Sequence, residues 1–99
     1  MNRYREEVGE ICRRRGWDQL PVDTVWLLFT EEIGELASAI RQRQKHFVKK
    51  SHCRDVVQDE MGDVFSYLFQ LASLLNVDLD TMWRNNISKM QQKIYVSEY

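Results

Sequence analysis

Two short acidic motifs are the part of this sequence whose residue types and spacing could do chemistry. The first reads E-E-I-G-E at residues 31–35, and the second reads E-M-G-D at residues 60–63. If both lie on helices, a spacing of three residues stacks the acids of each pair one turn apart on the same face. Four carboxylates, Glu32, Glu35, Glu60 and Asp63, can then meet across a helix pair, which is highly unfavourable without a cation. Hard divalent ions such as Mg2+ bind carboxylate oxygens, so the motifs predict a metal site.

The first motif lies in a predicted amphipathic helix from about residue 22 to about residue 44. On a helical plot, its apolar residues form one broad arc: Val25, Leu28, Phe29, Ile33, Leu36 and Ile40. Glu32 falls inside this arc and Glu35 at its edge, whereas Glu31 lies further out, where water reaches it. The placement of Glu32 and Glu35 on the apolar side of the helix therefore requires an explanation, whereas that of Glu31 requires it much less.

The second motif lies in a predicted helix from about Asp55 to about Leu75, with Asn76 as its C-terminal cap. Glu60 and Asp63 border the apolar surface of this helix rather than its polar face. The polar face is assigned to Asp55, Asp59, Ser66, Gln70 and Ser73.

Two further helices complete the chain. A short first helix ends at Gly16, residues 17–21 connect it to the second, and Asp78 or Asp80 caps a last helix. One proline, four glycines and no sustained alternation of polar and apolar residues argue against strands. The sequence predicts an all-α fold, a small four-helix bundle-like domain that covers residues 1–99 and is oligomeric, because so small a core gains from self-association.

Composition excludes several classes of protein. Hydrophobic residues make up 43% and charged residues 29%, which is typical of a globular domain. A net charge of -1 predicts no bulk attraction to nucleic acid, and acids interrupt the apolar runs before they reach membrane-spanning length. We expect a cytoplasmic protein with no nucleic-acid or membrane partner, in which Cys12 and Cys53 stay reduced.

The acids have simpler interpretations that the residues leave open. A single buried glutamate usually pairs with Arg or Lys, and the basic segment at residues 41–54 could be a solvated loop or could neutralise phosphate. Zinc is disfavoured because the key positions carry only carboxylates, and a di-iron bundle would need Glu-x-x-His. No pattern for a side-chain nucleophile is present, so metal-assisted attack of water on a phosphoanhydride fits best.

With this pair of motifs the sequence resembles the MazG-like all-α nucleoside triphosphate pyrophosphohydrolases, a family that includes the dCTP pyrophosphatases. Their signature is E-E-x-x-E followed, after a loop, by E-x-x-D. The resemblance implies hydrolysis of nucleoside triphosphates to monophosphate and pyrophosphate, with Mg2+ held by Glu32, Glu35, Glu60 and Asp63. It implies a role for Glu31 as base or outer ligand, and it implies substrate contacts from Trp17, Trp26, Tyr67, Asn86, Lys89 and Lys93.

The predicted function is therefore Mg2+-dependent cleavage of (deoxy)nucleoside triphosphates, a house-cleaning of the nucleotide pool, by a homodimer or homotetramer. Two alternatives remain. One is a phosphoribosyl-ATP pyrophosphatase, although those relatives usually carry Tyr-His where this chain has Tyr67-Leu68. The other is a non-catalytic helical dimerisation or nucleotide-binding module in which the acids pair with basic residues of another subunit.

Overall fold

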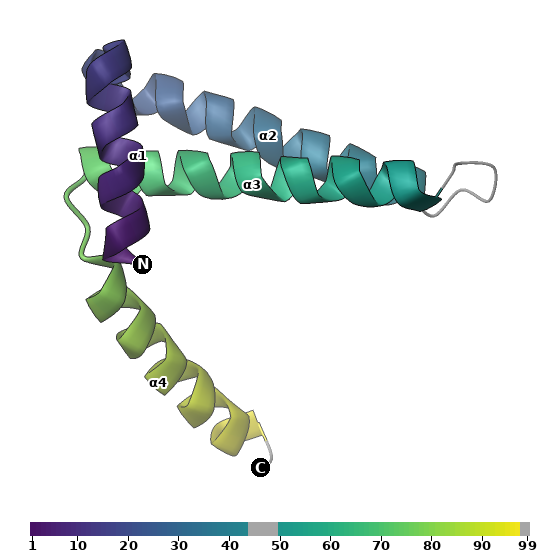
Figure 1. The fold of residues 1–99 in the computed structure, drawn as a ribbon. Helices are drawn as coiled ribbons and strands as arrows, with labels where there is room; N and C mark the ends of the chain where they lie inside the picture. Colours follow the sequence, from purple (N-terminus) through teal and green to yellow (C-terminus); the bar gives the residue numbers. More distant parts are fainter. Residues whose placement is uncertain (44–49, 98–99) are drawn as a thin grey trace.

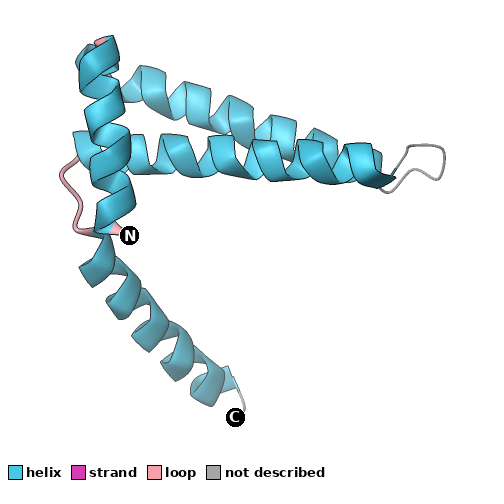
Figure 2. Ribbon diagram, in the orientation of Figure 1, coloured by secondary structure: helices cyan, strands magenta, loops and turns pink. Residues whose placement is uncertain are grey.

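The computed structural model describes residues 1–43 and 50–97, and the side chains of residues 1–42 and 56–92. In chain order these residues form α1 (Asn2–Arg15), the short 3-10 helix η1 (Trp17–Gln19), α2 (Val22–Arg43), α3 (Lys50–Leu74) and α4 (Leu79–Ser97). No strand occurs in the described ranges, as Figure 2 shows. The predicted all-α class is confirmed.

The helix ends follow from local sequence. Gly16 ends α1 with a φ of 74°, a left-handed conformation that glycine adopts without steric cost. Asn76 takes the same role after α3 with a φ of 55°. There the Asn76 N–H donates to the Ser73 carbonyl and the Val77 N–H to the Ala72 carbonyl, which is the Schellman arrangement. The sequence identified both caps.

The long helices α2 and α3 run antiparallel and side by side, and α1 crosses them at one end (Figure 1). Val25 is fully buried in the core, which also contains Cys12, Leu71 and Ala72. Where α1 meets α3, a Cβ on Gly9 would lie 2.9 Å from the Ser73 Oγ. Because glycine has no Cβ, α1 and α3 can approach each other closely at this point.

The fourth helix leaves this group and packs only against α1 to any extent (Figure 1). Asp78 caps it by accepting a hydrogen bond from the Thr81 N–H at 3.1 Å. Its start is anchored to the beginning of α1, where Asn2 Oδ1 accepts from the Leu79 N–H at 2.7 Å. The N-terminal ammonium lies 2.9 Å from Asp80 Oδ1. These contacts hold only the first turn, so the rest of α4 does not lie along α2 and α3.

Helix α3 begins at Lys50 rather than near Asp55, because residues 50–54 contain no glycine or proline that would stop a helix. The predicted basic segment therefore belongs partly to helices, and its residues 44–49 lie outside the described ranges. Within the described part of the chain, no helix has the length and apolar character needed to cross a membrane.

Candidate metal centre

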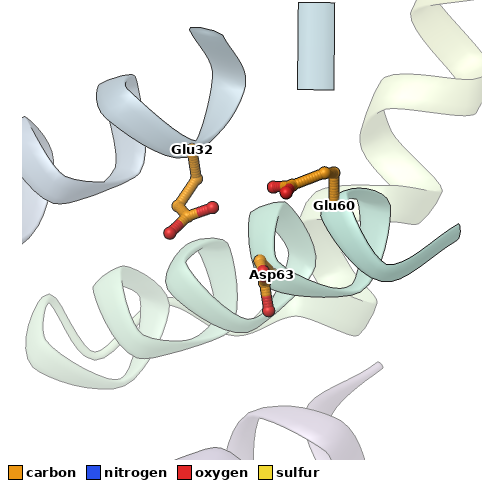
Figure 3. Close-up of side chains that lie close together, drawn as sticks. All are labelled: Glu32, Glu60 and Asp63. Carbon is orange, nitrogen blue, oxygen red and sulfur yellow. The ribbon is translucent and has the colours of Figure 1, made fainter. Parts of the chain in front are cut away.

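Three acids from the two motifs meet between α2 and α3. Glu32 extends from α2, and Glu60 and Asp63 lie one turn apart on the facing side of α3 (Figure 3). Each offers a carboxylate oxygen, and these three oxygens all lie within 4.8 Å of one another. Mg2+ binds oxygen ligands at about 2.0–2.1 Å, so small side-chain movements would bring the three acids onto one ion.

Two of these carboxylates have a buried oxygen with no partner. The Oε2 atoms of Glu32 and of Glu60 are enclosed by protein and accept no hydrogen bond. The ion pairs found among the described residues involve other acids, Glu7, Glu10 and Asp80, and none involves this cluster. Because a buried carboxylate oxygen is unfavourable without a cation or a donor, the residues fit a divalent cation.

Burial and mutual repulsion shift the protonation of the cluster. Loss of water around Glu32, followed by its interaction with the Glu35 carboxyl and the charges of Asp63 and Glu60, raises its pKa from 4.5 to about 7. Burial is also the first cause that raises the pKa of Glu60, followed by the charge of Glu35. A cation among these groups would reverse both effects, since it favours the ionised form.

The other two acids of the first motif lie further out. Glu35 is exposed and is not one of the three acids that converge, yet its carboxylate is near enough to affect both Glu32 and Glu60. Glu31 is exposed and lies outside the group of three. The structure thus places Glu32, Glu60 and Asp63 together, with Glu35 at the rim and Glu31 beyond it.

A cavity of about 500 Å³ opens directly beside the acids. Glu32 and Asp63 form part of its wall, so the cluster and the cavity are one continuous site. The remainder comes from α1, the connector, α2 and α3, through Val8, Ile11, Cys12, Trp17, Leu20, Leu28, Ser66, Tyr67 and Gln70. A mostly apolar cleft with a few polar groups is typical of a site for a small organic ligand.

Only some of the predicted substrate residues line this cavity. Trp17 and Tyr67 line the cavity. Trp26 does not, and instead stacks on Phe29 with ring centroids 5.8 Å apart. Asn86 and Lys89 are exposed on α4, and none of the described side chains of α4 lines the cavity. The side chain of Lys93 lies outside the described set.

The sequence analysis missed three polar residues of the cavity, Cys12, Ser66 and Gln70. Its assignment of Gln70 to an exposed polar face is wrong, because the residue is only 6% exposed. Helix α1 packs against α3, and its residues Gly9 and Cys12 line a small cavity together with Gln70. The signal was available, since Ser66, Tyr67 and Gln70 follow Asp63 at spacings of three, four and seven, which is one helix face.

Converging carboxylates beside an apolar cavity in an all-α chain fit a protein that binds a divalent cation together with a small organic ligand. Residues 21–94 match the family model described as the MazG nucleotide pyrophosphohydrolase domain, and this is most of the chain. The protein therefore belongs to the MazG family. The match begins at the start of α2, so α1 and Trp17 lie outside it.

One similar protein is the gene 37 protein of Mycobacterium phage L5. It is 39% identical over 64 residues, which cover 63% of this chain and 56% of that protein. The matched region thus spans little more than half the length of this relative. No solved structure matches the chain.

Proposed function

We propose that this protein hydrolyses nucleoside triphosphates, most of all deoxynucleoside triphosphates, to the monophosphate and pyrophosphate. The observation that carries the proposal is the convergence of Glu32, Glu60 and Asp63 within 4.8 Å, with two buried and unpartnered carboxylate oxygens. Membership of the MazG family supports the same reaction class. An activity of this kind would serve as a house-cleaning of the nucleotide pool in the cytoplasm.

The acids have distinct proposed roles. Glu32, Glu60 and Asp63 would hold Mg2+, and Glu35 at the rim would complete the ligand set. When bound, Mg2+ neutralises phosphate oxygens and lowers the pKa of a coordinated water. Glu31 and Glu35 are four residues apart and thus on one side of α2. The exposed Glu31 would accept the proton of the attacking water from that side.

The cavity would hold the nucleoside. Trp17 and Tyr67 are the aromatic groups of its wall and would pack against the faces of the base. Burial, together with the charges of Glu32 and Asp63, raises the pKa of Tyr67, so its hydroxyl stays protonated and can donate a hydrogen bond. Trp26 does not reach this cavity, and the proposal does not use it.

We also propose that the active form is a homodimer or homotetramer. Helix α4 carries exposed Met82, Trp83 and Met90, which a second copy of the chain would cover. The phosphate contacts predicted for Asn86, Lys89 and Lys93 would then be made across the subunit interface, since no α4 side chain within residues 79–92 lines the cavity of its own chain. The acids lack a basic partner among the described residues of their own subunit.

The test is a panel of nucleoside triphosphates, with phosphoribosyl-ATP included, incubated with the protein in Mg2+ or in EDTA. We expect Mg2+-dependent release of pyrophosphate and monophosphate, and its loss in Glu32→Gln. Nucleoside diphosphate among the products would refute cleavage between the α and β phosphates. No turnover, together with a melting temperature that Mg2+ does not change, would favour the non-catalytic module.

A further inference from the structure

Gln70 is a largely buried residue whose side chain lines the cavity beside the acids. The residue is 6% exposed, and no hydrogen bond to its amide is found among the described residues. The enclosed polar atoms without a partner belong, in the described part of the chain, to Glu32 and Glu60, so the Gln70 amide is open to the cavity. It lines the large cavity and also a smaller one of about 220 Å³ behind it. An amide that faces a cavity and makes no hydrogen bond within the protein has its donor and its acceptor free for a ligand.

The position of Gln70 along α3 fits one part of a nucleotide. Asp63 and Gln70 are seven residues apart on the same face, which is about 10 Å along the helix axis at 1.5 Å per residue. This is comparable with the reach from the 5′ oxygen of a nucleoside to the far edge of its base. Tyr67 lies between the two and lines the same cavity. With phosphates at the acids, the pairing edge of the base arrives at Gln70.

The remaining polar groups of the wall are less suited to read a base. The Ser66 hydroxyl already donates to the Gly62 carbonyl at 2.9 Å. Burial raises the pKa of the Cys12 thiol, which leaves it protonated and only a weak donor. The Gln70 amide offers a donor and an acceptor side by side, and nucleobases present the same pair along their pairing edge.

We propose that Gln70 is a specificity-determining residue that binds the pairing edge of the nucleobase through paired hydrogen bonds. The inference rests on the proposed function, because it takes the cluster of Glu32, Glu60 and Asp63 as the phosphate end of the site. The opposite wall, formed by α1 residues such as Val8 and Ile11, lies outside the range that matches the family.

The experiment measures binding of deoxynucleoside 5′-monophosphates and of deoxyribose 5-phosphate by calorimetry in MgCl2. Gln70→Leu keeps the size of the side chain and removes both hydrogen bonds. We expect it to weaken the tightest monophosphate about 10- to 100-fold, the loss of two neutral hydrogen bonds, and to leave deoxyribose 5-phosphate unchanged. Gln58→Leu, the same change at an exposed site on α3, is the matched control and should alter neither affinity.

Folding of the variant should not limit the test, because Gln70→Leu replaces a largely buried polar side chain by an apolar one of similar size and should keep or raise the melting temperature. Should it fail to fold, Gln70→Glu has nearly the same shape, loses the donor and should weaken binding of the same monophosphate. The proposal is overturned if a folded variant binds all the monophosphates within about twofold of the wild type. It is also overturned if affinity for deoxyribose 5-phosphate falls equally.

Turnover distinguishes this inference from the proposed function. If the wild type hydrolyses deoxynucleoside triphosphates while Gln70→Leu and Gln70→Glu keep kcat/KM for every base, the role of Gln70 is refuted and the function stands. If the wild type hydrolyses none but binds monophosphates in a manner that depends on Gln70, the function is refuted and base recognition by Gln70 stands.

Discussion

Removing the charge of Glu32 should stabilise the metal-free protein even though it removes one of the proposed Mg2+ ligands. The folded state raises the pKa of Glu32 from 4.5 to about 7. Between these values the folded protein binds more protons than the unfolded chain, so its stability falls as pH rises. Below about pH 4.5, Glu32 is protonated in both the folded and the unfolded state and does not lower stability. Above about pH 7 it is ionised in both states, and the folded protein bears the full cost of its buried charge. Glu32→Gln is neutral at every pH and escapes this penalty.

The size of the effect follows from the shift and the exposure of the side chain. One pKa unit corresponds to about 1.36 kcal/mol, which sets a ceiling of about 3 kcal/mol for Glu32. The side chain is only half-buried and its neighbours share the effect, so solvent screening reduces the expected value to about 1–2 kcal/mol. For a domain of this size that corresponds to a difference in Tm of about 5–15 °C.

The assay is urea unfolding followed by far-UV circular dichroism at about pH 5 and about pH 8 in EDTA, since the two values bracket the titration of Glu32. The wild type should be less stable at the higher pH, and Glu32→Gln should lose most of that difference. Glu31→Gln, the neighbouring exposed acid, should keep it. Mg2+ at the higher pH should restore stability to the wild type and have no such effect on Glu32→Gln.

Two outcomes would refute this reasoning. A wild-type protein that is equally stable or more stable at the higher pH would show that the cluster carries no unfavourable charge. Equal destabilisation by Glu32→Gln at both pH values would show that the carboxylate makes a favourable contact in the metal-free state.

Three further predictions concern the metal and the helices. Mg2+ at a hundred times its Kd should stabilise the wild type by about 2.7 kcal/mol, and a similar gain in Glu60→Gln would contradict its role as a ligand. Gly9→Ala should lower Tm, because its Cβ would lie 2.9 Å from Ser73 Oγ. Gly34→Ala has open space around it and should raise stability by about 1 kcal/mol. Calorimetry compares the two variants, and equal shifts in Tm would contradict the close approach of α1 and α3. Asp78→Ala should lower Tm by about 5 °C near neutral pH through loss of the helix cap. Since hydrogen bonds from Asn2 and the Thr81 N–H hold the pKa of Asp78 at about 2, this loss should vanish as pH falls through about 2, and a constant difference would exclude the carboxylate as the cap.

Local sequence was sufficient for the helices and for the centre of the site. Apolar periodicity placed α2 close to its observed bounds, and it identified Glu32 as an acid on the apolar side. The spacing of Glu60 and Asp63 put both on one face of α3. Gly16 and Asn76 were recognisable as caps because few residues adopt a positive φ. Each of these inferences depends on residues within one or two turns of each other.

Features that depend on contacts between distant segments could not be predicted from local sequence. Gln70 is polar, and on a lone helix its side of α3 would face water. It is buried because α1 crosses there, and that crossing depends on Gly9, about sixty residues away in the sequence. The direction of α4 is a second case. Met82, Trp83 and Met90 form an apolar stripe on this helix, and a stripe does not specify which surface covers it.

The shape of the chain links the fourth helix to the acids. The radius of gyration is 16.8 Å, whereas a compact domain of about 100 residues has one of about 13 Å, and α4, which projects away from α2 and α3 (Figure 1), contributes to the excess. Its exposed Met82, Trp83 and Met90 lack apolar cover, and the acid cluster lacks basic partners among the described residues of its own chain. A second copy whose α4 packs near the cluster would satisfy both needs, since that helix carries Lys89 beside its apolar stripe. In the function we propose, phosphate binding therefore depends on assembly, because a second copy of the chain supplies the basic residues.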